Sequence, residues 1–237
     1  MDILYIVIPA YNEEENIISV LNDWYPIVER HNGNGMSRLV VVDDGSKDST
    51  PQLLDAEAET RPLLTVLHKE NGGHGAAIHY GYDHAIARGA DYVFQTDSDG
   101  QTLPSEFEPF WRQRKRFDMV IGQRSLRQDG ASRVMVTRVL RLVLLAVFKK
   151  WIPDANTPFR LMKAGVLEEA LEYIEKDEPL TNVCISAVFA KKGRNVLYRQ
   201  ITFRARQGGV NSINLKKIAG IGKNALARFT KLDQMLE

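Results

Sequence analysis

The sequence predicts an α/β fold in which a mostly parallel sheet is covered by helices. Three observations support this prediction. Short apolar runs without polar alternation are typical of strands that are buried on both faces. Segments with helical periodicity separate these runs, and the alternation repeats from residue 3 to residue 101. Loops rich in Gly, Asn, Asp and Ser follow the apolar runs, so each strand is expected to end in a loop with polar groups.

The first strand and the first helix illustrate the pattern. Residues 3–8 are continuously apolar and are followed by Pro9, so they are expected to form a buried strand. A helix is expected over residues 13–30, because apolar residues recur there on one side. Its acidic start, Glu13 to Glu15, suits the positive end of a helix.

The alternation continues through the first half of the chain. Ser49, Thr50 and Pro51 have the residue types of a helix N-terminus, where hydroxyls precede a proline. Further strands are expected over residues 38–42, 63–67 and 91–95, and further helices from residue 51 and over residues 76–88.

The second half has fewer strand patterns. Strands are expected over residues 119–122 and 196–204, and a mobile loop over residues 125–132. Helices are expected over residues 106–115, 133–151, 165–175 and 183–191, and from Leu215 to the end.

Length and composition restrict the class of protein. A chain of 237 residues is long enough for one large α/β domain with a full core. A net charge of +1 gives no support for a global attraction to nucleic acid. The single cysteine, Cys184, excludes an intramolecular disulfide and fits a reducing compartment. Residues 1–9 lack the basic region of a signal peptide, and no uncharged apolar run reaches the roughly 18 residues of a membrane span.

Polar loops follow four of the expected strands, after Ile8, Val42, Leu67 and Gln95. Parallel strands end at the same edge of a sheet, and ligands bind at that edge in open α/β sheets. The coincidence of four such loops carries more weight than any one of them. The sequence therefore predicts a binding site at this edge.

The loop after Gln95 contains two carboxylates one residue apart, Asp97 and Asp99. Hard oxygen ligands of this kind suit Mg²⁺ or Mn²⁺, which keep positions open for phosphate oxygens. For the motif taken alone, solvated turn carboxylates are an equally weighted alternative.

The other three loops each have two interpretations. Asp44, beside Asp43, offers an acceptor to a base or ribose, or else the pair closes an Asx turn. Tyr11 either stacks on a base or packs as an ordinary aromatic. Residues 71–77, a glycine-rich run, either present backbone amides to a phosphate or form a tight turn. His74 within that run is either a phosphate donor or simply exposed.

The helix expected over residues 133–151 mixes apolar residues with five basic ones. It either lies in a lipid interface, with its basic side toward lipid phosphates, or packs on the core as an ordinary amphipathic helix. The gathering of basic residues in a chain near neutrality slightly favours a membrane surface as a partner.

Together these motifs resemble glycosyltransferase family 2, whose members have the GT-A fold. The matching segments are residues 8–13 (IPAYNE), 43–46 (DDGS), 71–76 (NGGHGA) and 97–101 (DSDGQ). More narrowly, the chain looks like the dolichyl/polyprenyl-phosphate mannosyltransferase branch. That likeness rests on Asp99-Gly100-Gln101, residues 121–124 (IGQR), Arg138 and residues 154–161 (DANTPFRL).

The resemblance implies a single GT-A catalytic domain over residues 1–237: a Rossmann-like, mostly parallel sheet flanked by helices, with an acceptor-side extension of helices and strands. Residues 1–124 would bind the nucleotide sugar, residues 125–212 would bind the acceptor, and residues 213–237 would form a helical tail. It implies a metal-dependent, inverting transfer of a sugar, with mannose or glucose favoured, to a polyprenyl or dolichyl phosphate. GDP-mannose or UDP-glucose is the implied donor, and Mg²⁺ or Mn²⁺ the implied metal. The alternative is a family 2 enzyme that acts on a saccharide hydroxyl in cell-surface polysaccharide synthesis.

The resemblance also implies roles for individual residues. Those that would hold the nucleotide sugar are Pro9, Ala10, Tyr11, Glu13, Asp44 and Gly75. Asp97, Asp99 and Gln101 would hold the metal and the diphosphate. Arg124 and Arg138 would meet the acceptor phosphate, to which arginine offers bidentate geometry, and with Asp97 and Asp99 they are the implied catalytic residues. Arg204 or Arg206, ahead of residues 208–212, would help to close the site.

The acceptor decides whether a general base is needed. A phosphate acceptor is already anionic near neutral pH, whereas a hydroxyl acceptor needs a base, typically a carboxylate. Asp177 and Glu178 lie where other family 2 members carry such a base. His74 departs from the family, which usually has Lys or Arg there.

Two rival classes are a nucleotidyltransferase, which would release pyrophosphate, and a nucleotide-binding subunit without activity. Many relatives carry a transmembrane tail, and either a soluble form with a membrane-anchoring partner or a shortened chain would fit its absence here. We expect a cytoplasmic protein, peripheral on the cytoplasmic membrane face.

Overall fold

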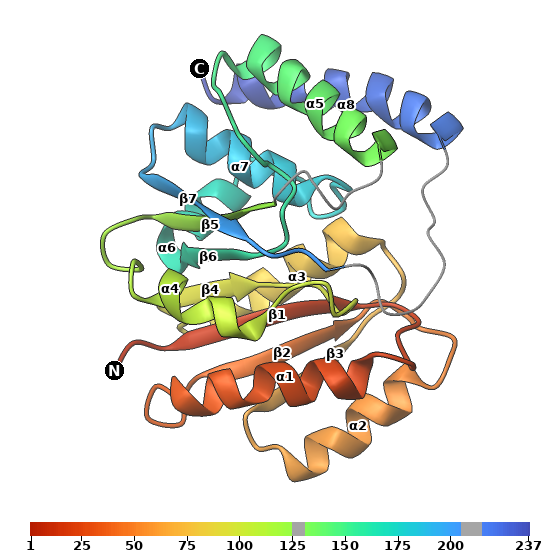
Figure 1. The fold of residues 1–237 in the computed structure, drawn as a ribbon, viewed down its shortest axis with the longest axis vertical. Coiled ribbons are helices and arrows are strands. Elements are labelled where there is room, and N and C mark those ends of the chain that lie inside the picture. The colour runs from red at the N-terminus through yellow and green to blue at the C-terminus, as the bar shows by residue number, and fades with distance from the viewer. Residues whose placement is uncertain (125–130, 205–214) are drawn as a thin grey trace.

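A computed structural model describes the backbone of residues 1–124, 131–204 and 215–237, and the side chains of residues 1–124, 137–204 and 225–237 (Figure 1). Arg206 and most of the loop expected over residues 125–132 lie outside these ranges.

Strands and helices alternate along the first half, as predicted. In chain order the elements there are β1 (Leu4–Ala10), α1 (Ile17–Arg30), β2 (Arg38–Asp43), α2 (Thr50–Thr60), β3 (Leu64–His68), α3 (His74–Ala87) and β4 (Tyr92–Gln95). The second half contains a short 3-10 turn (Pro104–Glu106), α4 (Phe107–Trp111), β5 (Met119–Arg124), α5 (Ala131–Phe148), β6 (Arg160–Lys163), α6 (Ala164–Leu171), α7 (Thr181–Lys191), β7 (Val196–Ile201) and α8 (Leu215–Met235).

The strands of the described residues form one seven-stranded sheet in the order β3-β2-β1-β4-β6-β5-β7. The neighbours β3, β2, β1 and β4 are parallel, and β5 is parallel to β7. Only β6 runs the other way, between β4 and β5. Six strands therefore end at one edge, which we call the carboxyl edge, and the predicted mostly parallel sheet is confirmed.

Both faces of the sheet are buried, which explains the unbroken apolar runs. Along β1, Leu4, Ile6 and Ile8 belong to one core cluster and Tyr5 and Val7 to the other, because successive side chains point to opposite faces. The first cluster is completed by α1, α2 and α4, and the second by α3, α5, α6, α7 and α8. In Figure 1 these two helical layers lie on opposite sides of the sheet.

The structure differs from the sequence expectation mainly at two places. The helix expected from Glu13 begins at Ile17, because Asn12 adopts a left-handed φ of 54° and Glu13 forms a turn whose carbonyl caps the N–H groups of Asn16 and Ile17. The strand β6 was not predicted. It has four residues between a proline-containing loop and a helix that follows at once, and Arg160 at its start is fully buried.

Helix α5 covers one end of the second core. Leu144 and Phe148 are buried, and Phe148 packs against Phe229 of α8, with ring centroids 6.1 Å apart. In contrast, Val139 and Leu142 are more than half exposed. None of the helices in the described residues is long and apolar enough to cross a membrane.

Candidate active site

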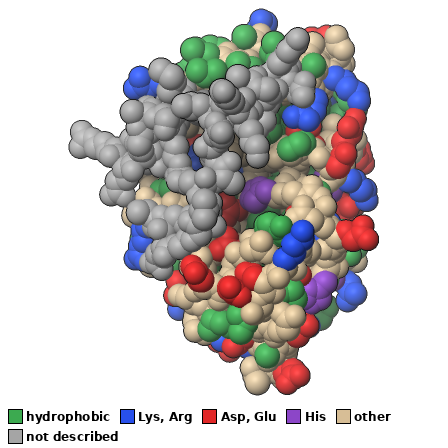
Figure 2. All heavy atoms as spheres, turned by 90° about the vertical axis from the view of Figure 1, so that its right-hand side faces the viewer, with side chains coloured by type: hydrophobic (Ala, Val, Ile, Leu, Met, Phe, Trp, Pro, Cys, Tyr) green, Lys and Arg blue, Asp and Glu red, His purple; other side chains and the backbone are tan. Residues whose placement is uncertain are grey.

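Loops from four parallel strands meet at the carboxyl edge, and Figure 2, which faces this edge, shows acidic side chains and a histidine near its middle. The first loop follows β1. Pro9 and Ala10 are buried, and Ala10 pairs with Asp43 of β2. The backbone N–H of Glu13 donates to the Thr50 hydroxyl, 2.9 Å away, which ties this loop to α2.

Tyr11 is 43% exposed, so its ring is not an ordinary core aromatic. Glu13 is buried, and one of its carboxylate oxygens accepts a hydrogen bond from the Asn16 side chain. The exposed ring of Tyr11 therefore leaves the stacking interpretation open, whereas the contacts of Glu13 organise its own loop.

The two aspartates after β2 have different surroundings. Asp43 accepts a hydrogen bond from the backbone N–H of Ser46 at 3.1 Å, which is the Asx turn that the sequence offered as one interpretation. Its other oxygen lies 3.0 Å from Nδ1 of His68, whose Nε2 lies 3.0 Å from Asp55. Hydrogen bonds to Asp43 and then to Asp55 raise the pKa of His68.

Asp44 holds the glycine-rich loop. It is 3% exposed, and its carboxylate accepts hydrogen bonds from the N–H groups of Gly72 (2.9 Å) and Gly73 (2.7 Å) and from Lys69 Nζ (2.5 Å). The sequence indicated Asp44 but not Lys69, because a lysine after a strand has no distinguishing pattern. This carboxylate fixes the loop before α3, with Gly73 at a left-handed φ of 86°.

Gly75, in the first turn of α3, lies under the α6–α7 connection. A Cβ atom at this position would lie 2.0 Å from the carbonyl oxygen of Glu178. The Thr181 hydroxyl donates to that same carbonyl at 2.6 Å. Close packing is therefore sufficient to explain a glycine here.

Asp97 stands at the centre of the edge. Its Oδ1 accepts a hydrogen bond from the Gln95 side-chain amide at 2.9 Å and lies 3.1 Å from Nε2 of His74. Desolvation lowers the pKa of His74, although its side chain is about half exposed; the charge of Asp97, the hydrogen bond to Asp97 and then the charge of Asp99 outweigh this effect, and the net shift is upward. His74 thus contacts the first of the two carboxylates.

The loop that carries Asp99 is closed by local hydrogen bonds. The hydroxyls of Thr96 and Thr102 lie 2.7 Å apart, and the N–H of Gln101 donates to Asp99 Oδ1 at 3.1 Å. The side-chain amide of Gln101 donates to the carbonyl of Arg204 at 2.7 Å, and the Arg204 N–H donates back to the Gln101 carbonyl at 2.8 Å. The segment after β7 is therefore attached to the aspartate loop.

The donor set at this loop fits a divalent cation. Carboxylate oxygens of Asp97 and Asp99 and the amide oxygen of Gln101 are hard ligands of the kind that Mg²⁺ and Mn²⁺ prefer. Within the described residues, no three His, Cys, Asp or Glu side chains gather into a ready metal cluster. A cation here would take further oxygens from its ligand or from water.

Arg124 lies at the end of β5 and is held by Asp154. Its Nε and Nη2 donate to the two carboxylate oxygens at 3.0 and 2.9 Å, and its backbone N–H donates at 3.2 Å. The guanidinium carbon also lies 5.2 Å from the ring centroid of Phe203, next to Arg204. Arg124 is therefore connected to the aspartate loop through residues 203–204 and Gln101.

The other predicted arginines are less constrained. Arg138 is exposed on α5, and one turn later Arg141 donates to the carbonyl of Pro153, beside Asp154. Arg204 is exposed, and its backbone carbonyl and N–H form the two hydrogen bonds with Gln101. Arg206 lies outside the described residues.

The two candidate general bases have different surroundings. Glu178 is buried, and its Oε1 accepts a hydrogen bond from the Leu180 N–H before α7, while Oε2 lies 3.3 Å from Arg228 of α8. Asp177 is exposed and lines a surface pocket with His79 and Tyr80.

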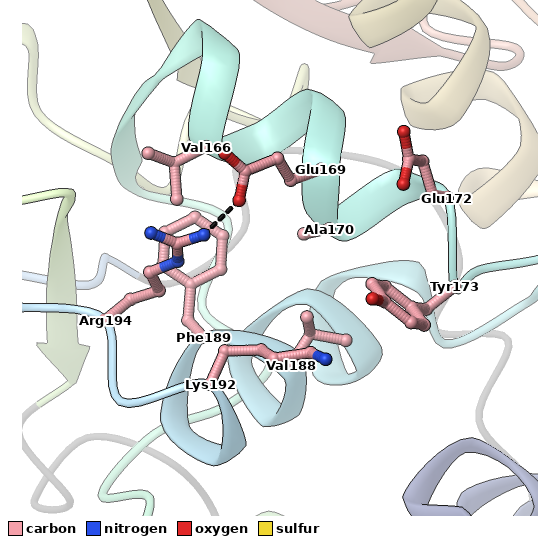
Figure 3. A pocket seen from close by; sticks show the side chains of 9 residues that line it. All are labelled: Val166, Glu169, Ala170, Glu172, Tyr173, Val188, Phe189, Lys192 and Arg194. Atoms are coloured by element: carbon pink, nitrogen blue, oxygen red, sulfur yellow. Dashed lines mark hydrogen bonds and ion pairs between the residues drawn. The ribbon is translucent and has the colours of Figure 1, made fainter. Parts of the chain in front are cut away.

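A pocket of about 270 Å³ lies between α6 and the end of α7 (Figure 3). Arg194 forms an ion pair with Glu169 at its wall, and Lys192 lies 4.6 Å from the ring centroid of Tyr173. This wall belongs to the end of α7, whereas the start of α7 contacts the carboxyl edge through Asn182 and Gln95. The pocket is therefore distinct from the aspartate loop.

Comparisons with known proteins agree with this geometry. The model of the family described as "Glycosyl transferase family 2" matches residues 5–171, which is more than half of the chain. A UDP-N-acetylglucosamine–dolichyl-phosphate N-acetylglucosaminyltransferase of Methanococcus voltae is 31% identical over 216 residues, with 81% of each chain covered. An undecaprenyl-phosphate mannosyltransferase of Micrococcus luteus is 27% identical over 234 residues, covering 95% of this chain and 91% of the relative.

Solved structures show the same fold. A glucosyl-3-phosphoglycerate synthase of Mycobacterium tuberculosis, solved with Mn²⁺, UDP and glucosyl-3-phosphoglycerate, superposes with a TM-score of 0.71. The match covers 98% of this chain and 80% of that chain at 19% sequence identity. The expected GT-A architecture is thereby confirmed.

Proposed function

The chain belongs to glycosyl transferase family 2 and is a glycosyltransferase, and from this premise we propose that it transfers a sugar from a nucleotide diphosphate sugar to a polyprenyl or dolichyl phosphate. In this reaction the bond between the anomeric carbon and the diphosphate breaks, and a bond from that carbon to an acceptor phosphate oxygen forms on the opposite face. A nucleoside diphosphate leaves. Relatives named for mannose and for N-acetylglucosamine transfer support the acceptor class more than any one sugar.

One observation carries the proposal most directly. The aspartate loop and Arg124 meet at one edge through residues 203–204, so anion-binding and cation-binding groups are adjacent. A transfer between two phosphorylated substrates needs both kinds of group. Holding the two substrates in line can lower the barrier by roughly 7–11 kcal/mol.

The nucleotide sugar would lie across the ends of β1, β2 and β4. Tyr11, with its exposed ring, would stack on the base, and Pro9, Ala10 and Glu13 would line the nucleoside pocket. Asp44 would take part in holding the nucleoside, and its carboxylate also fixes the glycine loop through Gly72 and Gly73. GDP-mannose and UDP-glucose remain the favoured donors.

Asp97, Asp99 and Gln101 would hold Mg²⁺ or Mn²⁺ together with the diphosphate. When bound, the metal would offset the negative charge that develops on the leaving diphosphate. His74, which stands at the start of α3 and contacts Asp97, would present a positive charge beside that diphosphate when protonated. This replaces the Lys or Arg that is usual in the family.

The acceptor phosphate would be bound by Arg124, with its fork oriented by Asp154, and by Arg138 on the exposed side of α5. No general base is required, because the phosphate is already an anion. The contacts of Glu178 with the start of α7 and with Arg228 agree with this, since they engage one of the two candidate bases elsewhere.

The membrane surface is the proposed place of work. Val139, Leu142 and Leu145 form an exposed apolar stripe along α5, and Lys149 and Lys150 lie exposed at its end. Such a surface suits the boundary between acyl chains and anionic headgroups. We propose a peripheral position on the cytoplasmic face, with a membrane-anchoring partner as a further possibility to test.

The test compares acceptors that differ in one group. Purified protein would be given Mg²⁺ or Mn²⁺, a nucleotide diphosphate sugar, and either polyprenyl phosphate or the polyprenol of the same length. The release of nucleoside diphosphate would be measured. We expect release with the phosphate only, and Arg138→Ala to raise the acceptor KM more than the donor KM. Equal rates with the alcohol would contradict the proposal. Release of pyrophosphate in a separate assay with a nucleoside triphosphate and a sugar phosphate would indicate a nucleotidyltransferase.

A further inference from the structure

Arg160 is the largest fully buried side chain of the described residues, and its hydrogen bonds account for all five guanidinium N–H groups. Nε and Nη2 both donate to the carbonyl of Thr157, at 3.0 and 2.7 Å, and Nη2 also donates to the carbonyl of Ala155 at 2.9 Å. Nη1 donates to the carbonyl of Asn182 at 2.9 Å and lies 3.4 Å from the Ser186 hydroxyl.

Within the described residues, the acceptors of Arg160 are backbone carbonyls and one hydroxyl, and none of them is a carboxylate. A buried charge without a directly paired opposite charge is expensive, and the hydrogen bonds to these acceptors offset part of that cost. Burial lowers the pKa of Arg160, and the neighbouring groups Tyr82, Asp154, Tyr198 and Asp97 oppose that shift in this order.

The first set of contacts leads to the acceptor side. Ala155 and Thr157 belong to the loop between α5 and β6, which also carries Asp154, and this carboxylate orients the Arg124 guanidinium through two side-chain hydrogen bonds. Ser186 of α7 reinforces the same loop, since its hydroxyl donates to the Ala155 carbonyl at 2.9 Å. If the loop shifts, Asp154 shifts with it, and Arg124 loses its orientation.

The second set leads to the metal side. Arg160 holds the carbonyl of Asn182 in the first turn of α7, and the Asn182 side-chain amide donates to Gln95 Oε1 at 3.0 Å. Gln95 in turn donates to Asp97 Oδ1 at 2.9 Å. Arg160 and Gln95 are also register partners across β6 and β4, so backbone and side chains both join them.

We propose that Arg160 is a positioning residue that fixes the acceptor-side Arg124 and the metal-side Asp97 in one arrangement, through Asp154 on one side and through Asn182 and Gln95 on the other. The inference rests on the proposed function, from which it takes the roles of Arg124 and Asp97. It assigns to one buried side chain the alignment of the two substrates, although that side chain touches neither.

Arg160→Lys tests this role, because lysine keeps the charge but cannot reach the carbonyls of both the 155–157 loop and α7. Two readouts do not depend on transfer. The first is the Mn²⁺ affinity in the presence of UDP or GDP, and the second is the hydrogen-exchange rate of the Arg124 backbone amide, which donates to Asp154. We expect a loss in Mn²⁺ affinity of about 10- to 100-fold, which is typical for groups that orient a metal ligand, and faster exchange at Arg124.

Two control variants test the two sets of contacts separately. Asn182→Ala removes the amide that holds Gln95 and should weaken Mn²⁺ binding alone. Asp154→Asn should speed exchange at Arg124 and raise the acceptor KM, with Mn²⁺ affinity unchanged. If Arg160→Lys lowers the melting temperature but moves neither readout, Arg160 is only structural and the proposal is wrong.

Ser186→Ala covers the case in which Arg160→Lys does not fold. It removes one weak contact of Arg160 and the hydroxyl that bridges Ala155 and Asn182, so smaller shifts in both readouts are expected. No shift in either would overturn the proposal. A wild-type protein that binds Mn²⁺ with nucleotide, responds as described to these variants and still transfers nothing to polyprenyl phosphate would contradict the proposed function instead.

Discussion

Gly75→Ala probes the contact between the donor-side helix α3 and the α6–α7 connection. A Cβ at Gly75 would lie 2.0 Å from the Glu178 carbonyl oxygen, 2.9 Å from the Cα of Pro179 and 3.0 Å from the Glu178 carbonyl carbon. Ordinary contact begins near 3.4 Å, so the backbone must move by about 1.4 Å (3.4 − 2.0). The atoms in the way are backbone atoms, so a side-chain rotation cannot relieve the clash.

The expected cost follows from two effects. Overpacking of a well-packed site typically costs about 1–3 kcal/mol. Moving the Glu178 carbonyl also weakens its hydrogen bond from Thr181, which is worth about 0.5–1.5 kcal/mol. Together these predict a loss of about 3 kcal/mol in the free energy of unfolding.

Urea unfolding measures this loss as a change in midpoint at constant slope. Gly165→Ala in α6 is the matched control, because nothing lies within 4 Å of its added Cβ. It should stabilise the protein by about 0.4–1 kcal/mol. A Gly75→Ala variant within about 0.5 kcal/mol of the wild type would refute the packing argument. If that stable variant lost donor binding, Gly75 would instead allow the substrate to approach.

Three further predictions concern the site and its surroundings. Asp99→Ala should abolish transfer while the urea midpoint stays near that of the wild type, and retention of most activity would rule out Asp99 as a main metal ligand. Asp177→Ala should leave transfer to polyprenyl phosphate within about twofold, because this acceptor needs no base; a large loss would point to a hydroxyl acceptor. The raised pKa of His68 predicts a stabilisation that is fully present below its unfolded pKa near 6.5 and is lost as the pH rises through the higher folded pKa. The difference in unfolding free energy between wild type and His68→Asn should therefore shrink from pH 6 to pH 9, and a constant difference would contradict it.

Much of the fold could be predicted from the sequence, because strands buried on both faces leave unbroken apolar runs. Runs such as residues 3–8 and 38–42 mark β1 and β2, and polar loops mark where strands end. The strand β6 could not be found in this way. Its start at Arg160 carries a charge in the centre of the molecule, and hydrogen bonds to carbonyls from distant segments, rather than a local pattern, keep it there.

The candidate site likewise contains residues that the sequence indicates and residues that only the structure shows. Asp97 and Asp99 were recognisable because their spacing after a strand is itself a chemical pattern. Lys69 and Asn182 were not, because each acts on a neighbour that only the fold brings close. Asp154 lies in the matching segment 154–161, but its contact with Arg124 is seen only in the structure. Asp44 illustrates an intermediate case, since the sequence indicates the residue, while its hydrogen bonds to Gly72 and Gly73 are seen only in the structure.

The most direct test is a transfer assay with purified protein, Mn²⁺ or Mg²⁺, polyprenyl phosphate in detergent and a panel of nucleotide sugars labelled in the sugar. We predict that label from one donor enters the organic phase, that chelation of the metal abolishes this transfer, and that Asp99→Ala does not support it. If nucleotide binds but no lipid-linked label forms with any donor, the acceptor is not a polyprenyl phosphate under these conditions and the central claim is contradicted.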